Sequence, residues 1–123
     1  MQKWSNYARR QKKRKMKITA DLYQEAQDSD IPIMSLPIPH SGSMCIQSND
    51  RQCYIGIDSN ILRSHIQERV HLAHELGHCK TGSFYNRYAS VDIRQKHENR
   101  ADKWAIKKLV PKDELDTMVQ DGH

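Results

Sequence analysis

The sequence VHLAHELGH occupies residues 70–78 and contains the pattern His-Glu-x-x-His. On a helix, residues four apart lie on the same face, one turn above the other. His74 and His78 can therefore present two imidazoles to one metal ion. Glu75 lies on the neighbouring stripe, close enough to hold a water bound to that ion. Two histidines and a carboxylate base at this spacing are typical of the active-site helix of a zinc metalloprotease.

The residues around this motif predict a long helix that begins at Ser64. Ser64 and Gln67 resemble a capping box, in which side chains satisfy the free N–H groups of the first turn. Apolar residues form two more stripes on this helix, which predicts that it is buried: Ile66, Val70, Ala73 and Gly77, and Leu72, Leu76 and Cys79. Since glycine lowers helix stability, we expect another backbone to approach closely at Gly77. Gly82 is the expected left-handed cap.

The residues before this helix predict a short helix and a small antiparallel sheet. Residues 18–27 show helical spacing of apolar side chains. The segment 31–39 contains three prolines, which restrict it to an edge strand or an extended connector. Residues 44–47 and 52–57 are predicted strands, joined by a polar turn.

After the motif, we expect a helix over about residues 93–110, with Asp92 as its N-cap and Gln95 three residues on. Pro111 would end this helix and begin a last one, whose buried side would carry Leu115, Met118 and Val119. The fold class predicted from all of these elements is α+β: a small antiparallel sheet packed with a buried active-site helix and a second helix that carries a ligand.

A catalytic zinc needs a third protein ligand, which must come from another element. The candidates downstream are Asp92, His97, Glu98 and Asp102. Glu98 is favoured because Ala101, Ala105 and Asp102 share its face, and the small alanines would let this helix approach the first one closely. Asp102 could then accept the ring N–H of His74 or His78 and fix its tautomer.

His97 points about 100° away from Glu98 on an ideal helix, which makes it the weaker candidate for the third ligand. The alternative interpretation of Glu98 and Asp102 is a solvated acidic pair among basic neighbours. These neighbours are Arg94, Lys96, Arg100 and Lys103.

Length and charge divide the chain into a basic arm, residues 1–17, and a single domain, residues 18–123. The arm contains eight Lys or Arg and no acid, and the rest of the chain has 12 basic and 15 acidic residues. We expect the arm to be a solvated, flexible leader or an upstream extension before Met16, and nucleic acid would be a partner only through this arm. No stretch predicts a membrane span or a secretory signal. The three cysteines, without Cys-x-x-Cys spacing, predict reduced thiols and a cytoplasmic protein.

Together, these motifs resemble those of the ImmA/IrrE family of metallopeptidases. That family has His-Glu-x-x-His, then Glu-x-x-Ala-x-x-aromatic-Ala, then a helix end at Leu/Val-Pro. The matching residues here are 74–78, 98–105 and 109–111, and together the motifs cover about residues 64–111. Two departures are Trp104, where phenylalanine is common, and a chain that ends soon after Pro111, where relatives commonly continue.

The resemblance implies a zincin-like fold and one zinc ion held by His74, His78 and Glu98, with Glu75 as the catalytic base. It also implies a setting in prophages and integrative elements, where such proteins cleave or otherwise antagonise a helix-turn-helix repressor. The function expected on this basis is zinc-dependent endopeptidase activity on a protein substrate. Substitution of Glu75 is the most direct test of this activity.

A second electrophile is usually needed for the oxyanion, and Tyr85, Tyr88 and His71 are the candidates. The extended segment before the motif helix could offer an edge strand to a peptide substrate. The alternative function is a non-catalytic, zinc-containing regulatory module that binds a repressor or nucleic acid. An open site with three ligands argues against it, because structural zinc sites are closed by four.

Overall fold

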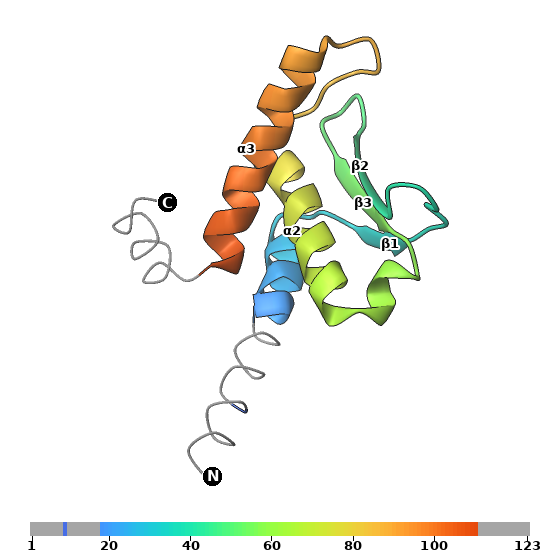
Figure 1. Cartoon of the computed structure of the whole chain (residues 1–123), viewed down its shortest axis with the longest axis vertical. Coiled ribbons are helices and arrows are strands. Elements are labelled where there is room, and N and C mark those ends of the chain that lie inside the picture. The colour runs from blue at the N-terminus through green and yellow to red at the C-terminus, as the bar shows by residue number, and fades with distance from the viewer. Residues whose placement is uncertain (1–8, 10–17, 111–123) are drawn as a thin grey trace.

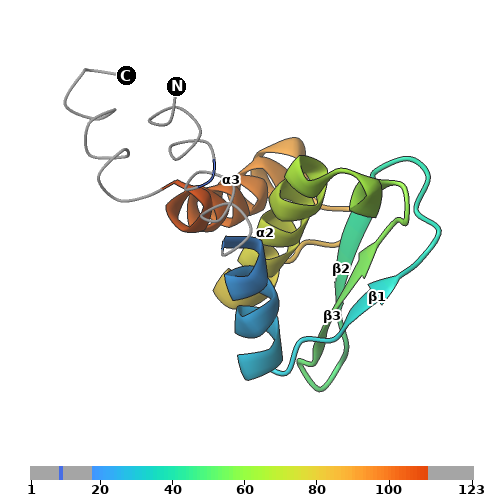
Figure 2. The same cartoon turned by 90° about the horizontal axis from the view of Figure 1, so that it is seen from below.

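The structure is a computed structural model, and it describes residue 9 and residues 18–110. In chain order these residues form a helix at 18–28, β1 (Ile33–Ser35), β2 (Ser43–Gln47), β3 (Cys53–Ile57), a 3-10 turn η1 (Ile61–Arg63), α2 (His65–Thr81) and α3 (Val91–Leu109). This is the small α+β fold that was predicted. Figure 1 and Figure 2 show α2 between the sheet on one side and α3 on the other.

Two predicted segments fall outside this range. The basic arm 1–17, apart from residue 9, and the last helix expected after Pro111 lie outside the described residues.

The sheet is mixed, so the prediction of an antiparallel sheet is wrong for one strand. The strand order is β1-β3-β2, with β2 antiparallel to β3 and β1 parallel to it. The polar turn between β2 and β3 makes a local hairpin, which sequence patterns identify. The pairing of β1 is non-local and leaves no such pattern. Pro32, which has no N–H to donate, precedes this edge strand and accepts a hydrogen bond from the Ile55 N–H through its carbonyl.

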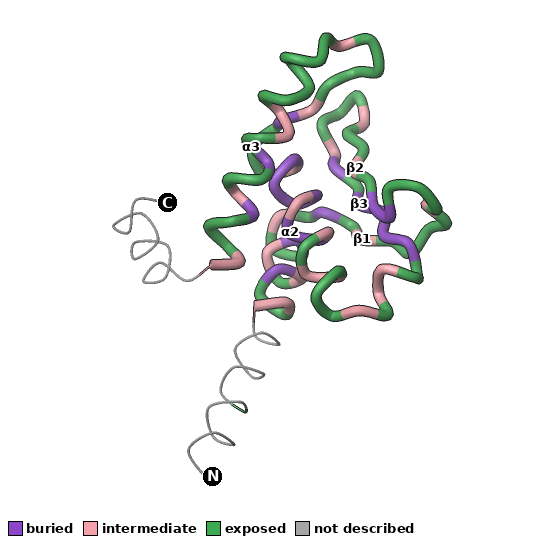
Figure 3. The backbone as a smooth tube through the Cα atoms, viewed as in Figure 1, coloured by how far each residue is buried: buried purple, intermediate pink, exposed green. Residues whose placement is uncertain are grey.

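The hydrophobic core lies between α2 and the sheet, as the buried segments in Figure 3 show. Leu72 and Leu76 of α2 and Ile55 of β3 are completely buried, and Leu22 of the first helix joins them. The predicted burial of the other apolar stripe of α2 is wrong at its start. Val70, like Ile66 before it, is exposed.

The ends of α2 agree with the prediction. The Ser64 side chain accepts a hydrogen bond from the Gln67 N–H, and Gly82 has the left-handed conformation, with φ of 66°. The predicted N-cap of α3 is wrong. Ser90, in extended conformation, accepts the bond from the Ile93 N–H. Asp92 instead lies in the first turn, where its charge suits the positive end of the helix.

Helices α2 and α3 make the close approach that Gly77 predicted. A Cβ atom added at Gly77 would lie 2.4 Å from the backbone oxygen of Ala101. Ala101 and Ala105 are both buried at this interface. The small residues therefore let α3 reach the motif helix, and this contact sets the distance from Glu98 to the two histidines.

A disulfide joins Cys53 of β3 to Cys79 of α2, and only Cys45 is free. The prediction of three reduced thiols is therefore wrong, and the thiols no longer support a cytoplasmic location. The Cα atoms are 6.1 Å apart, which is an ordinary separation for a disulfide. The pair is separated by 26 residues, and only packing of the helix on the sheet brings it together. Among the described residues, no helix is long and apolar enough to cross a membrane.

Candidate metal centre

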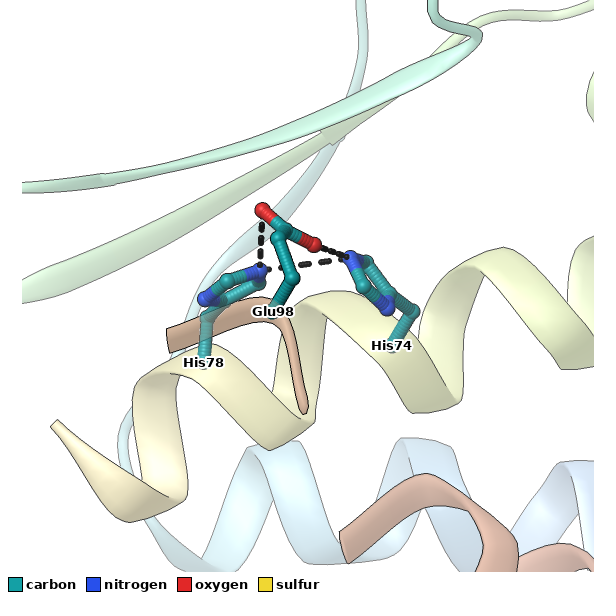
Figure 4. A group of neighbouring side chains, drawn as sticks. All are labelled: His74, His78 and Glu98. Atoms are coloured by element: carbon teal, nitrogen blue, oxygen red, sulfur yellow. Dashed lines mark hydrogen bonds and ion pairs between the residues drawn. The ribbon is translucent and has the colours of Figure 1, made fainter. Parts of the chain in front are cut away.

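The three predicted ligands come together where α3 crosses α2 (Figure 4). The His74 Nε2 atom lies 2.9 Å from Glu98 Oε2, and the His78 Nε2 atom lies 3.3 Å from Glu98 Oε1. The two Nε2 atoms are 3.2 Å apart. His74 and Glu98 are partly exposed, and His78 is buried. These residues form a group that could hold a metal ion.

The hydrogen-bond partner at Nδ1 of each histidine ring fixes the tautomer of that ring. The Nδ1 atom of His74 lies 2.8 Å from Asp102 Oδ1, and the Nδ1 atom of His78 lies 2.6 Å from the backbone oxygen of Ser83. A carboxylate and a carbonyl can only accept, so both Nδ1 atoms carry the proton. In a neutral ring this leaves Nε2 with a free lone pair. Asp102 thus accepts from His74, one of the two histidines for which it was the expected partner.

These lone pairs supply a test of whether a metal fits. Two unprotonated nitrogens and a carboxylate at these distances repel one another unless a cation lies between them. Ligands about 2.0–2.1 Å from a tetrahedral zinc are about 3.3 Å from each other. The distance of 3.2 Å between the two Nε2 atoms agrees with this value. Donor type, tautomer and spacing therefore all fit a small divalent metal ion.

Tyr85 supports the carboxylate of Glu98. Its hydroxyl donates a hydrogen bond of 2.7 Å to Glu98 Oε1. Burial raises the pKa of Glu98, but this hydrogen bond and the nearby His78 and His74 together hold the pKa below its usual value. The same hydrogen bond is the main cause that raises the pKa of Tyr85. Glu98 is therefore an anion and Tyr85 a neutral donor near neutral pH.

Glu75 lies beside the group without joining it. Its side chain is buried, and Oε2 accepts a hydrogen bond of 2.6 Å from the Ser43 hydroxyl. A cleft of about 770 Å³ runs over Glu75 and the three candidate ligands. The other residues that line this cleft come from four segments. They are Ser41, Ser43, Met44, Cys45, Val70, His71, Ser83, Phe84, Tyr85, Asp102, Ala105, Ile106 and Leu109.

The structure separates the three oxyanion candidates. Tyr85 and His71 line the cleft. Tyr88 is 79 % exposed, and its hydroxyl accepts a hydrogen bond from Arg87. In the part of the chain that the structure describes, Tyr88 is not a cleft residue. The rival ligand His97 also stays outside the group, with its ring stacked on Tyr85 at 6.1 Å between centroids.

Three residues of the site were missed by sequence reasoning: Ser43, Cys45 and Ser83. Ser43 and Cys45 lie on β2, and both line the cleft. Burial, followed by the Glu75 carboxylate, raises the pKa of the Cys45 thiol and keeps it protonated. Ser83 contributes a backbone oxygen, which any residue could supply. No spacing or residue type in the sequence marks these positions.

Comparison of the chain with protein-family models, curated proteins and solved structures found no match in any of the three. The similarity to the ImmA/IrrE family therefore rests on the motif residues alone. What the structure adds is their geometry: His74, His78 and Glu98 could bind a metal ion together.

Proposed function

We propose that this chain is a zinc-dependent endopeptidase. The observation that carries the proposal is the convergence of two Nε2 lone pairs and the Glu98 carboxylate beside Glu75, in an open cleft. Within the described residues, this group has three members. Three protein ligands leave a fourth position for water or substrate, whereas structural zinc sites are usually closed by four. The donor set therefore favours a catalytic site over a purely structural one.

The proposed roles follow from the contacts. His74, His78 and Glu98 would hold the zinc ion, which when bound lowers the pKa of water and polarises a carbonyl group. Glu75 takes a proton from the attacking water and passes it to the leaving amine. Tyr85 and His71 both stay oxyanion candidates, since the Tyr85 hydroxyl donates to Glu98 at the metal group and Nδ1 of His71 is engaged by Ser43.

The cleft is compatible with an extended peptide. Strand β2 lies at one edge of the sheet, and its Ser43, Met44 and Cys45 line the cleft. A peptide pairing with this edge would run past Glu75 through main-chain hydrogen bonds. Apolar side chains at one end of the cleft, including Val70 and Ile106, would then receive apolar side chains of the substrate. Similarity to the ImmA/IrrE family suggests a helix-turn-helix repressor as that substrate.

The test is incubation of the zinc-loaded protein with the repressor encoded beside its gene, with products identified by mass spectrometry. We expect cleavage by the parent protein and none by Glu75→Gln, which should keep its metal because Glu75 is not a ligand. Asp92→Asn is the matched control, since it makes the same acid-to-amide change on an exposed part of α3. Repressor antagonism that is equal in the parent and Glu75→Gln would contradict the peptidase and support a binding module.

A further inference from the structure

The position of Glu75 depends on two residues that are not metal ligands. We propose that Ser43 is a positioning residue, and that Ser43 and His71 form a hydrogen-bond chain that orients the Glu75 carboxylate. This inference rests on the proposed function, because it assigns Glu75 a task that needs a fixed orientation. It also changes the interpretation of His71, from an oxyanion stabiliser to the outer end of a support for the base.

The chain consists of two short contacts on one hydroxyl group. Ser43 Oγ lies 2.6 Å from Glu75 Oε2 and 2.7 Å from His71 Nδ1. Ser43 and Glu75 are both buried, each with 6 % of its surface exposed. His71 and Glu75 are four residues apart on α2, so both face the same strand. Ser43 of β2 therefore bridges two side chains of one helix face.

The direction of the protons follows from the chemistry of the three groups. An ionised carboxylate can only accept, so the single hydroxyl proton of Ser43 goes to Glu75. The Ser43 oxygen must then accept from His71, which places a proton on Nδ1 of that ring. Bonds to a charged acceptor are the stronger kind. The chain therefore runs from His71 through Ser43 to Glu75.

The backbone holds Ser43 in place for this role. Gly42, with φ of 81°, turns the chain into β2. Its carbonyl accepts a 2.8 Å hydrogen bond from the Asp58 N–H, and the Asp58 side chain accepts one from the Ile38 N–H at 2.7 Å. A Cβ atom added at Gly42 would lie 3.2 Å from His71 Cε1. The start of β2 is thus held to Asp58 directly before Ser43.

The hydrogen-bond chain from His71 through Ser43 to Glu75 has a specific consequence for the proposed reaction. The hydroxyl engages Oε2, which restricts rotation of the carboxylate that would take the proton from the attacking water. A base held within reach of its proton donor is worth more than a freely rotating one. Loss of Ser43 should therefore lower the rate of the chemical step without changing how the substrate or the metal binds.

The first experiment compares Ser43→Ala with the parent in the cleavage assay. Removing a hydrogen bond to a charged group predicts a fall in kcat of about 10- to 100-fold. KM and zinc affinity should stay within about twofold of the parent, because Ser43 contacts neither the substrate nor the metal in this proposal. Ser43→Thr keeps the hydroxyl and should recover much of the loss. The control Ser35→Ala removes an exposed hydroxyl on β1 and should act like the parent.

A second readout does not depend on activity. Nitrogen NMR of the zinc-loaded parent at about pH 8.5, where an ordinary histidine is neutral, should show His71 with its proton on Nδ1. Ser43→Ala should lose this preference. His71→Ala should add nothing to the kcat loss in the Ser43→Ala background, since both act through one chain.

An unprotonated Nδ1 in the parent, or a Ser43→Ala protein with parental kcat, would overturn the proposal. If the parent shows no cleavage at all, the proposed function fails. The His71 tautomer then decides the hydrogen-bond chain on its own: a proton on Nδ1 that Ser43→Ala removes supports it, and any other pattern contradicts it.

Discussion

His74 and His78 lie one turn apart on α2, yet their rings are held in different ways. Nδ1 of His74 is held by the side chain of Asp102, which is 55 % exposed. Nδ1 of His78 is held by the backbone oxygen of Ser83, in a buried position. One ligand therefore depends on a residue type on α3. The other depends on the path of the chain just after α2.

The metal centre therefore has two halves, one around His74 and one around His78. Each half should lose its contribution to metal binding for a different reason. The His74 half should respond to substitution of Asp102. The His78 half should tolerate a change of side chain at Ser83 but respond to anything that moves the end of α2. The disulfide at Cys79, directly after His78, and the left-handed cap at Gly82 both belong to that end.

The largest effect is expected from the disulfide. Opening a loop of this length predicts a loss of about 3–4 kcal/mol of unfolding free energy. Chemical denaturation with and without a thiol reductant measures it, and zinc affinity should fall with it through His78. The Cys45→Ser control should keep the whole redox dependence, since Cys45 is free. Three titratable thiols in the native protein before reduction would contradict the pairing.

Next in size is Gly77→Ala, which should disturb both halves together. Helix propensity alone would favour alanine by about 1 kcal/mol. The added Cβ would collide with the backbone of Ala101, so we expect a net loss of about 1–3 kcal/mol in unfolding free energy. Thermal unfolding and zinc titration check this. Lys103→Ala, on the exposed side of α3, should change neither, and a more stable Gly77→Ala protein would show that the helices are not in close contact.

A smaller effect is expected from Asp102→Ala. Removing the partner of a metal-binding histidine lowers metal affinity by about 10- to 100-fold, and the exposure of Asp102 places the result at the lower end. Competition with a coloured chelator gives the affinity. Parental zinc affinity in this variant would mean that His74 does not depend on the Asp102 side chain.

The smallest effect is expected from Ser83→Ala. The carbonyl that accepts from His78 remains, so zinc affinity should stay within about twofold of the parent. The same chelator competition measures it beside Asp102→Ala. Stability should fall slightly, because the Ser83 hydroxyl is buried against Thr81. A loss of zinc affinity larger than that of Asp102→Ala would reverse the comparison.

The same contrast explains what the sequence could predict. Glu98 and Asp102 were found because helical spacing places them on one face with Ala101 and Ala105. The cap at Ser64 and the close approach at Gly77 were also predictable, because each follows from local geometry. These features all depend on residues near one another in the chain.

What the sequence did not predict is non-local or carried by the backbone. The parallel pairing of β1 and the disulfide between Cys53 and Cys79 require packing of distant segments. The contact of Ser83 uses a group that every residue has. Ser43 is 32 residues from Glu75, and a serine in a strand carries no signal of its partner. The cap of α3 was misplaced because Ser90 and Asp92 are both good N-caps.

The central claim is that His74, His78 and Glu98 bind one metal ion while Glu75 does not. Zinc content after dialysis, measured for the parent, Glu98→Ala and Glu75→Gln, tests it most directly. We predict about one zinc per chain in the parent and in Glu75→Gln, and loss of the ion in Glu98→Ala. A Glu98→Ala protein that keeps its zinc as firmly as the parent would contradict the account.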